Sequence, residues 1–141
     1  MTRVDFHFNA PEKLLYGCRL VRKIYRSGGK VLVWCEDPVA LANFDQLLWT
    51  FSDQDFIPHV AASDALAAET PVLLTAQLVE SAHHEVIVNL GSDTPPMFSR
   101  FDRLIEVVAS HDTDRAQARE RWRFYKDRGY PLHAHDLARA A

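Results

Sequence analysis

The chain has 141 residues, a hydrophobic fraction of 48%, a charged fraction of 25% and a formal net charge of -3. This composition is typical of one globular domain and excludes a disordered or fibrous chain. No apolar run is long enough for a secretory signal or a membrane-spanning helix. We therefore expect a single domain over residues 1–141, located in the cytoplasm.

The first predicted element is a strand in "RVDFHFN". Val4, Phe6 and Phe8 alternate with Asp5 and His7, which is the period of a strand with one buried and one polar face. A helix is expected after it, because "PEKLLYGCRLVRKIYR" repeats its apolar residues at helical spacing and is followed by two glycines.

The next two elements are a buried strand and a second helix. "KVLVWCED" is continuously apolar, which is typical of a strand covered on both faces. Asp37 and Pro38 suit the N-cap and first position of a helix over "PVALANFDQLLWTF". In that helix, Leu41, Phe44 and Leu48 share one face with the following Phe51.

The second half of the chain is rich in strand patterns. "FIPHVAA", "PVLLTA", "HHEVIVNLG" and "FDRLIEVVA" are each expected to form a strand, and a last helix follows with Asp112 or Thr113 as its cap. Strands that alternate with helices in this way predict an α/β domain in three layers, α/β/α, with a mostly parallel sheet.

Motifs for nucleotide binding or catalysis are not recognisable. "SGGKV" differs from a phosphate loop, because its glycines follow a helix and Val31 stands where Ser or Thr is needed. Glu36 and Asp37 end a buried strand, where α/β enzymes keep catalytic groups, but capping already explains Asp37. Together with His59, these carboxylates remain the residues that an alternative function as a small nucleotide-dependent enzyme would use.

Metal binding is not expected either. His83 and His84 are adjacent, so on a strand they point to opposite faces. His133 and His135 lie in a C-terminal tail without further ligands close in sequence. Cys18 and Cys35 form no CxxC pair, and we expect reduced thiols in the core. No cofactor is predicted.

The last helix combines positive charge with aromatic side chains in "ARERWRFYKDRGY". At 100° per residue, Arg115, Arg119, Trp122 and Lys126 fall close together, and Arg123 lies beside them. This pattern fits an anionic partner with an apolar anchor, either an acidic peptide ending in an aromatic residue or single-stranded nucleic acid. A solvated helix with its Trp partly in the core would show the same pattern.

A second aromatic group lies in "FDQLLWTFSDQDFIPH". Trp49 falls on the polar side of its helix, and Phe56 and Pro58 follow a polar loop. Exposed aromatic residues are candidate anchors of a protein interface. The alternative is that the segment after the helix covers Trp49.

These two stretches together resemble the chi subunit of the bacterial replicative DNA polymerase III holoenzyme. The similarity extends over nearly the whole chain and includes "YRSGGKVLVWCED", "VIVNLG" and "PPMFSRFDRLIEVV" in the order of that family. It implies a nucleotide-binding-like fold without a nucleotide site. It also implies a non-catalytic adaptor of the clamp-loader assembly, with no direct sequence-specific DNA binding.

The resemblance also implies partners and site residues. The acidic C-terminal tail of single-stranded DNA-binding protein would bind at the last helix, and the psi subunit, or a helicase, at the second aromatic group. The residues implied for the tail are Arg119, Trp122 and Arg123, with Tyr125 and Lys126 as neighbours. Those implied for the psi subunit are Trp49, Phe56 and Pro58. Direct binding of single-stranded nucleic acid by the last helix remains an alternative.

Overall fold

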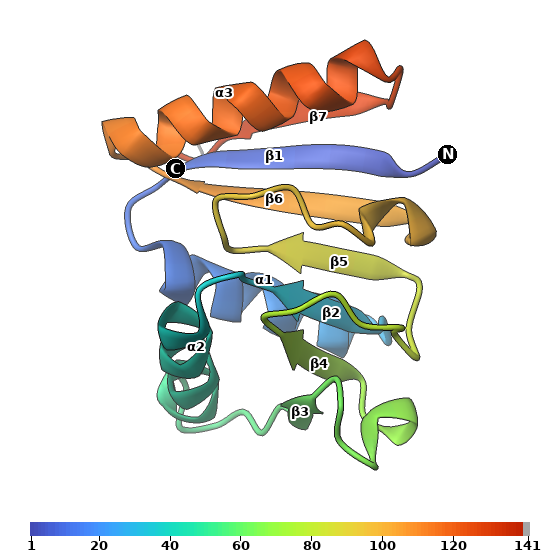
Figure 1. Cartoon of the computed structure of the whole chain (residues 1–141). Helices are drawn as coiled ribbons and strands as arrows, with labels where there is room; N and C mark the ends of the chain where they lie inside the picture. The colour runs from blue at the N-terminus through green and yellow to red at the C-terminus, as the bar shows by residue number, and fades with distance from the viewer. Residues whose placement is uncertain (140–141) are drawn as a thin grey trace.

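One parallel β-sheet runs through the molecule (Figure 1). The computed structural model describes residues 1–139. The strands lie in the order β3-β4-β2-β5-β6-β1-β7, and every strand pair among these residues is parallel. The strands are β1 (Arg3–Ala10), β2 (Val31–Trp34), β3 (His59–Ala61), β4 (Val72–Thr75), β5 (Val86–Asn89), β6 (Arg103–Ala109) and β7 (Leu132–Asp136).

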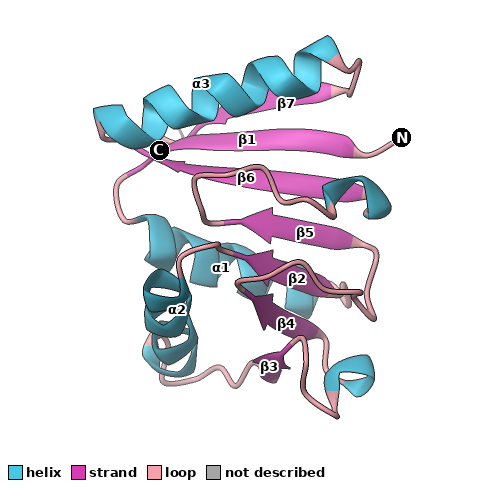
Figure 2. Ribbon diagram, in the orientation of Figure 1, coloured by secondary structure: helices cyan, strands magenta, loops and turns pink. Residues whose placement is uncertain are grey.

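Helices cover both faces of the sheet (Figure 2). Helices α1 (Lys13–Arg26) and α2 (Pro38–Thr50) bury their apolar sides against one face, and α3 (Asp112–Asp127) packs on the other. The predicted three-layer α/β domain is confirmed, and the sheet is more regular than expected because it is purely parallel within the described residues. No described helix has the length and apolar character that crossing a membrane requires.

Local sequence signals explain the β2–α2 unit. All of the residues of β2 are buried, as its continuous apolar pattern predicts. The Asp37 carboxylate accepts a hydrogen bond from the Val39 amide at 3.0 Å, and Pro38 is the first helical residue. Helix α1 ends before Gly28, whose φ of +85° lies in the left-handed region that favours glycine. These predicted boundaries are confirmed.

Two local predictions are wrong at the C-terminal end. The presumed tail that holds His133 and His135 forms the edge strand β7, which pairs with β1. Its sequence "LHAHD" carries little apolar pattern, and most of its residues are exposed at the edge of the sheet. The cap of α3 is His111, whose Nδ1 accepts a hydrogen bond from the Asp114 amide at 3.3 Å, instead of Asp112 or Thr113.

Strand β1 also differs from the predicted half-polar strand. Asp5 is fully buried in spite of its charge, and His7 is half-buried. The reason is that the guanidinium groups of Arg3 and Arg103 fold over the Asp5 carboxylate and pair with it. The polar side of β1 is therefore an ordered ion-pair cluster instead of a solvated face.

Candidate functional site

A buried polar network fixes α3 on the sheet. Glu106 of β6 is completely buried and accepts hydrogen bonds from the Tyr125 hydroxyl at 2.6 Å, Asn89 Nδ2 at 2.9 Å and Arg121 Nε at 3.1 Å. Burial raises the pKa of Glu106, and the Arg121 charge and the hydrogen bonds oppose that rise. Because Arg121 and Tyr125 both point inward, the opposite side of α3 faces solvent.

The N-terminal end of α3 has a separate attachment. The buried Asp114 carboxylate accepts from the Ala109 amide at 2.7 Å and pairs with Lys13 Nζ at 3.0 Å. These contacts join α3 to β6 and α1. Both ends of the helix are thus held, and the side chains along it have a defined position.

An apolar hollow lies where α3 meets β1 and β7. It has a volume of about 340 Å³, and we call it the α3 hollow. It is lined by Phe6, Phe8, Val108, Arg115, Ala118, Arg119, Trp122 and Ala134. The half-buried Trp122 ring packs edge-on against Phe6, with ring centroids 5.1 Å apart. The exposed arginines therefore border an opening whose walls are aromatic and aliphatic.

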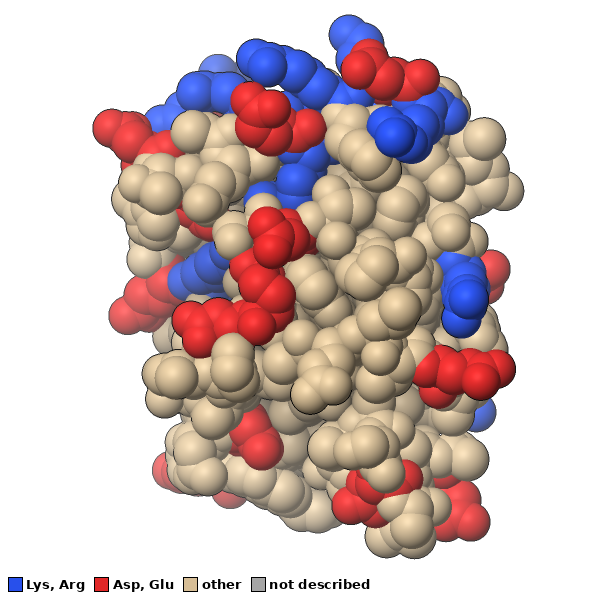
Figure 3. Space-filling view, viewed as in Figure 1, with Lys and Arg blue, Asp and Glu red and all other residues tan. Residues whose placement is uncertain are grey.

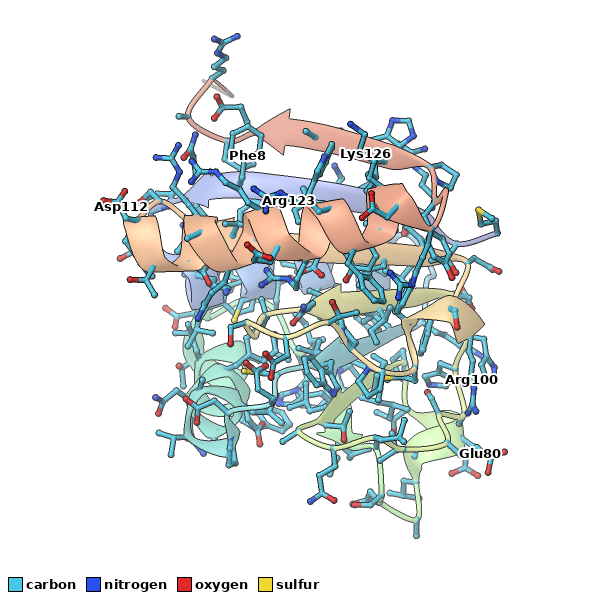
Figure 4. All side chains as sticks on the ribbon, turned by 45° about the horizontal axis from the view of Figure 1, so that its top comes forward. Phe8, Glu80, Arg100, Asp112, Arg123 and Lys126 are labelled. Atoms are coloured by element: carbon cyan, nitrogen blue, oxygen red, sulfur yellow. The ribbon has the colours of Figure 1, made fainter. Side chains whose placement is uncertain are left out.

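The helical wheel predicted that Arg115, Arg119, Trp122 and Lys126 lie close together. The structure confirms this for Arg115, Arg119 and Trp122. Arg119 and Trp122 line the α3 hollow, whereas Arg123 and Lys126 are exposed on α3 outside its lining (Figure 4). Arg123 lies 3.4 Å from Glu120 in a surface ion pair. Tyr125 is a correction: it is buried with its hydroxyl on Glu106, so it supports the helix from beneath and does not reach the surface.

Several residues of the α3 hollow were not predicted as site residues. Phe6 and Phe8 were expected to be core residues of a strand, and Val108 and Ala134 were not singled out. Their contribution depends on β1, β6 and β7 meeting beneath α3, which no local pattern shows. The half-buried Phe8, in contrast to the buried Phe6, marks where the core opens into the hollow.

Charge is unevenly distributed over the surface. In Figure 3, most of the visible Lys and Arg side chains lie along the top, over α3, while the lower part of that face carries mainly Asp and Glu. A net charge of -3 therefore coexists with a cationic α3. An anionic ligand would be attracted to this end of the molecule.

The second predicted surface is also aromatic and exposed. Trp49 is 45% exposed and Phe56 is 68% exposed, and their ring centroids are 5.6 Å apart. Pro58 is half-buried beside them. The segment after α2 covers Trp49 only in part, because Phe56 and His59 pack on its ring and the residue stays 45% exposed. We call these residues the Trp49/Phe56 surface.

His59 supports this surface from below. Its Nδ1 lies 2.7 Å from the Ile57 carbonyl oxygen and its Nε2 lies 2.8 Å from Asp45 Oδ1. The Trp49 ring packs on the imidazole with centroids 4.0 Å apart. Because His59 is buried and both of its ring nitrogens are engaged, it supports this surface and is not placed as the base that the alternative enzyme function would use.

The carboxylates of the alternative enzyme function also have structural partners. Glu36 Oε1 accepts from the amide and hydroxyl of Ser92 at 2.7 and 2.5 Å. Burial acts to raise the pKa of Glu36, but the hydrogen bonds from Ser92 outweigh it and keep that pKa below its usual value. Asp37 is the α2 cap. Within residues 1–139, no group of three or more His, Cys, Asp or Glu side chains is placed to hold a metal ion.

The predicted thiols are confirmed as free and buried. Neither Cys18 nor Cys35 forms a disulfide. Burial raises the pKa of Cys18 to about 12 and also raises the pKa of Cys35. Such thiols pack as small apolar side chains.

The fold and these two surfaces define a small α/β protein with an apolar hollow beside α3 and an exposed aromatic pair at Trp49 and Phe56. The family model described as DNA polymerase III chi subunit, HolC, matches residues 1–133, so the chain belongs to the family of DNA polymerase III chi subunits. Membership confirms the resemblance seen in the sequence and the expectation of a replication subunit in place of an enzyme.

Individual relatives agree with the family match. The chain is 36% identical to the DNA polymerase III subunit chi of Pseudomonas aeruginosa, with 99% of each chain covered. It is 28% identical to the subunit of the same name from Escherichia coli strain K12, over 93% of this chain and 88% of the relative. It is 29% identical to the subunit of the same name from Haemophilus influenzae, over 82% of this chain and 81% of the relative.

Proposed function

We propose that this chain is a non-catalytic adaptor of the polymerase III clamp-loader assembly. The α3 hollow binds the acidic C-terminal tail of single-stranded DNA-binding protein. The Trp49/Phe56 surface binds the psi subunit, or a helicase in its place. The proposal joins membership of the chi family to the two aromatic surfaces of the chain.

The observation that carries the tail proposal is an apolar hollow bordered by arginines. A tail that ends in an aromatic residue would place its ring against Trp122 and Phe8, and its carboxylates near Arg115 and Arg119. Burying such a ring contributes about 1.5–3 kcal/mol, whereas each exposed ion pair adds about 0.2–1 kcal/mol. After the costs of association, we expect micromolar affinity, about -8 kcal/mol, that weakens with salt.

Calorimetric titration with a synthetic acidic peptide ending in phenylalanine tests this proposal. Arg119→Ala and Arg123→Ala form a matched pair, because both arginines are exposed on α3 but only Arg119 lines the hollow. We expect Arg119→Ala to weaken binding about three- to fivefold, Trp122→Ala to weaken it by tenfold or more, and Arg123→Ala to change it by less than about twofold.

Two results would contradict the tail proposal. One is an equal loss for Arg119→Ala and Arg123→Ala, which would indicate attraction by the helix charge without use of the hollow. The other is unchanged affinity for a peptide whose terminal phenylalanine is replaced by serine. In this proposal, Lys126 acts as a cation that attracts the tail over a longer distance. Lys126→Ala should therefore affect only the salt dependence of the peptide affinity.

Substitution of Phe56 tests whether the Trp49/Phe56 surface binds the psi subunit. Its ring is 68% exposed, so truncation to Ala should leave the fold intact. We expect Phe56→Ala and Trp49→Ala to weaken co-elution with a psi subunit in gel filtration while leaving affinity for the acidic peptide unchanged. Loss of peptide binding in either variant, or full retention of psi binding in both, would refute the assignment of this surface.

A further inference from the structure

On the α1 side of the sheet, β1 and β7 carry polar side chains that the helices cover only in part. Helix α1 packs against β2 and β6 and reaches β1 through Tyr16, whose hydroxyl oxygen lies 2.5 Å from His7 Nδ1, whereas the edge strand β7 extends beyond the helix (Figure 2). In parallel pairs, partner residues point to the same side of the sheet. The strand pairing therefore places these side chains together on the α1 side: Arg3 beside Arg103, Asp5 beside His133, and His7 beside His135. We call this set the β1/β7 face.

Asp5 holds the two arginines of this face in a fixed orientation. Its carboxylate is fully buried, with Oδ1 3.2 Å from Arg3 Nε and Oδ2 2.5 Å from Arg103 Nε. Burial acts to raise the pKa of Asp5, but the hydrogen bonds and charges of Arg103 and Arg3 outweigh it and keep that pKa below its usual value. One ionised carboxylate thus serves two guanidinium groups, which leaves an excess of positive charge.

The outer ends of both guanidinium groups remain available. Asp5 engages only the Nε atoms, and the hydrogen bonds and ion pairs formed among residues 1–139 do not use the terminal Nη groups of Arg3 or Arg103. The two side chains are 51% and 39% exposed and start from adjacent strands, about 4.8 Å apart. A planar guanidinium fits a phosphate through two parallel hydrogen bonds, and here the pair is oriented in advance.

Ring side chains continue the face along the strands. The centroids of His7 and His135 are 4.9 Å apart, and the His135 side chain is 48% exposed. Burial lowers the pKa of His7 to about 4, with His135, Arg103 and Lys23 acting in the same direction. His7 is therefore a neutral ring near neutral pH. Histidine rings and arginine planes are surfaces on which unstacked bases pack.

We propose that the β1/β7 face binds single-stranded nucleic acid without sequence preference, through phosphates at Arg3 and Arg103 and bases against His135 and His133. The exposed side chains here are cationic or ring-shaped and polar, so the face lacks the apolar anchor that the α3 hollow offers to a peptide. The site is separate from both surfaces of the proposed function. An adaptor with this face would touch the nucleic acid as well as the protein that coats it.

Fluorescence anisotropy of a labelled oligo-dT, measured with the full chain over a range of salt concentrations, tests the proposal. Because the chain is acidic overall, we expect weak binding, with a dissociation constant of about 10⁻⁴ to 10⁻⁶ M. Two phosphate contacts to a single strand predict a slope of about -1.4 for log K against log salt. Arg3→Ala should weaken binding about three- to tenfold and reduce the slope by about 0.7.

Arg3 is the preferred position because Asp5 keeps Arg103 as its partner when Arg3 is removed. His133→Ala is a second variant, since this side chain is exposed and forms no ion pair among the described residues. We expect it to weaken oligo-dT binding about fivefold through loss of base stacking. Urea unfolding of both variants checks that the fold is intact.

Arg119→Ala is the matched control, because Arg119 lies on the opposite side of the sheet, at the α3 hollow. It should keep oligo-dT binding and weaken acidic-peptide binding about three- to fivefold, whereas Arg3→Ala should weaken oligo-dT binding and keep acidic-peptide affinity. The proposal is overturned if oligo-dT does not bind at low salt, if Arg119→Ala abolishes that binding, or if Arg3→Ala weakens only the acidic peptide. The tail proposal is tested separately, by titration of the wild-type chain with the acidic peptide.

Discussion

Glu106→Gln removes a buried charge and changes the shape of the side chain only slightly. We expect it to destabilise the protein more severely than this small change in shape suggests. Arg121 is 3% exposed, and Glu106→Gln removes its buried counter-ion. Removing one partner of a buried ion pair costs about 3–5 kcal/mol. Since domains of this kind are stable by about 5–15 kcal/mol, the loss would be at least about a fifth of the total.

The reverse variant, Arg121→Met, should behave differently because Glu106 can neutralise itself by taking up a proton. Arg121 is the main influence that lowers the pKa of Glu106 against its burial, so its removal raises that pKa further. A group whose folded-state pKa is raised stabilises the fold fully below its unfolded pKa, about 4.3 for Glu, and this stabilisation is lost as pH rises through the folded pKa.

Urea unfolding at about pH 5 and about pH 8 distinguishes the two cases. Relative to wild type, Arg121→Met should lose little stability at the lower pH and more at the higher. Glu106→Gln should show a similar loss at both, because arginine remains protonated throughout. Equal pH dependence of the two variants, or a cost below about 1 kcal/mol for Glu106→Gln, would refute the view that this pair holds α3 in place.

Three further outcomes are expected from local geometry. Cys18, with its buried thiol and a pKa raised to about 12, should react with a thiol reagent only on the timescale of unfolding; rapid reaction of the native protein would contradict its burial. Gly91→Ala should cost about 1–3 kcal/mol in thermal unfolding, since a methyl carbon there would lie 1.7 Å from Glu36 Oε2, and an unchanged melting temperature would show that Glu36 is free to move. Asp37→Ala should cost about 1 kcal/mol by loss of the cap on α2, while Asp37→Asn should cost much less; equal losses would exclude the capping role.

Sequence signals that act over a few residues predicted the fold well. The continuous apolar run of β2, the Asp37–Pro38 start of α2 and the glycine after α1 each fix one local conformation. Strand β7 was missed because "LHAHD" has no such signal. It forms by adding to β1, a strand that lies more than a hundred residues earlier in the chain.

Buried charges could not be predicted for a related reason. Hydrophobic patterning assigns Asp5, Glu106 and Arg121 to the surface, because an isolated charge is costly to bury. Each is buried here only because a partner arrives from another element: Arg103 for Asp5, and Arg121 together with Tyr125 for Glu106. The same network turned Tyr125 inward and removed it from the predicted surface.

The candidate site was predicted on one side only. Helical spacing brought Arg119 and Trp122 together, but the opposite wall of the α3 hollow comes from Phe8 of β1 and Ala134 of β7. A helical wheel gives the direction of side chains on one helix and contains no information on what faces them. Arg123 was placed beside the others for this reason, although it lies outside the lining.

The position of the two proposed surfaces predicts that both partners bind at once. The α3 hollow lies at the β1–β7 end of the sheet, whereas His59 of β3, which supports Trp49, lies at the other end. Six inter-strand steps of about 4.8 Å separate β7 from β3, so the surfaces are about 29 Å apart. A short peptide in the hollow would not reach the Trp49/Phe56 surface.

Titration of the acidic peptide into the free chain and into its complex with a psi subunit tests this independence. We expect the two dissociation constants to agree within about twofold, because distant sites on a rigid sheet have little coupling free energy. An affinity for the peptide that fell tenfold or more in the complex would mean that α3 and α2 respond to each other through the sheet. In that case the chain would exchange its partners, and it could not hold them together as a bridge.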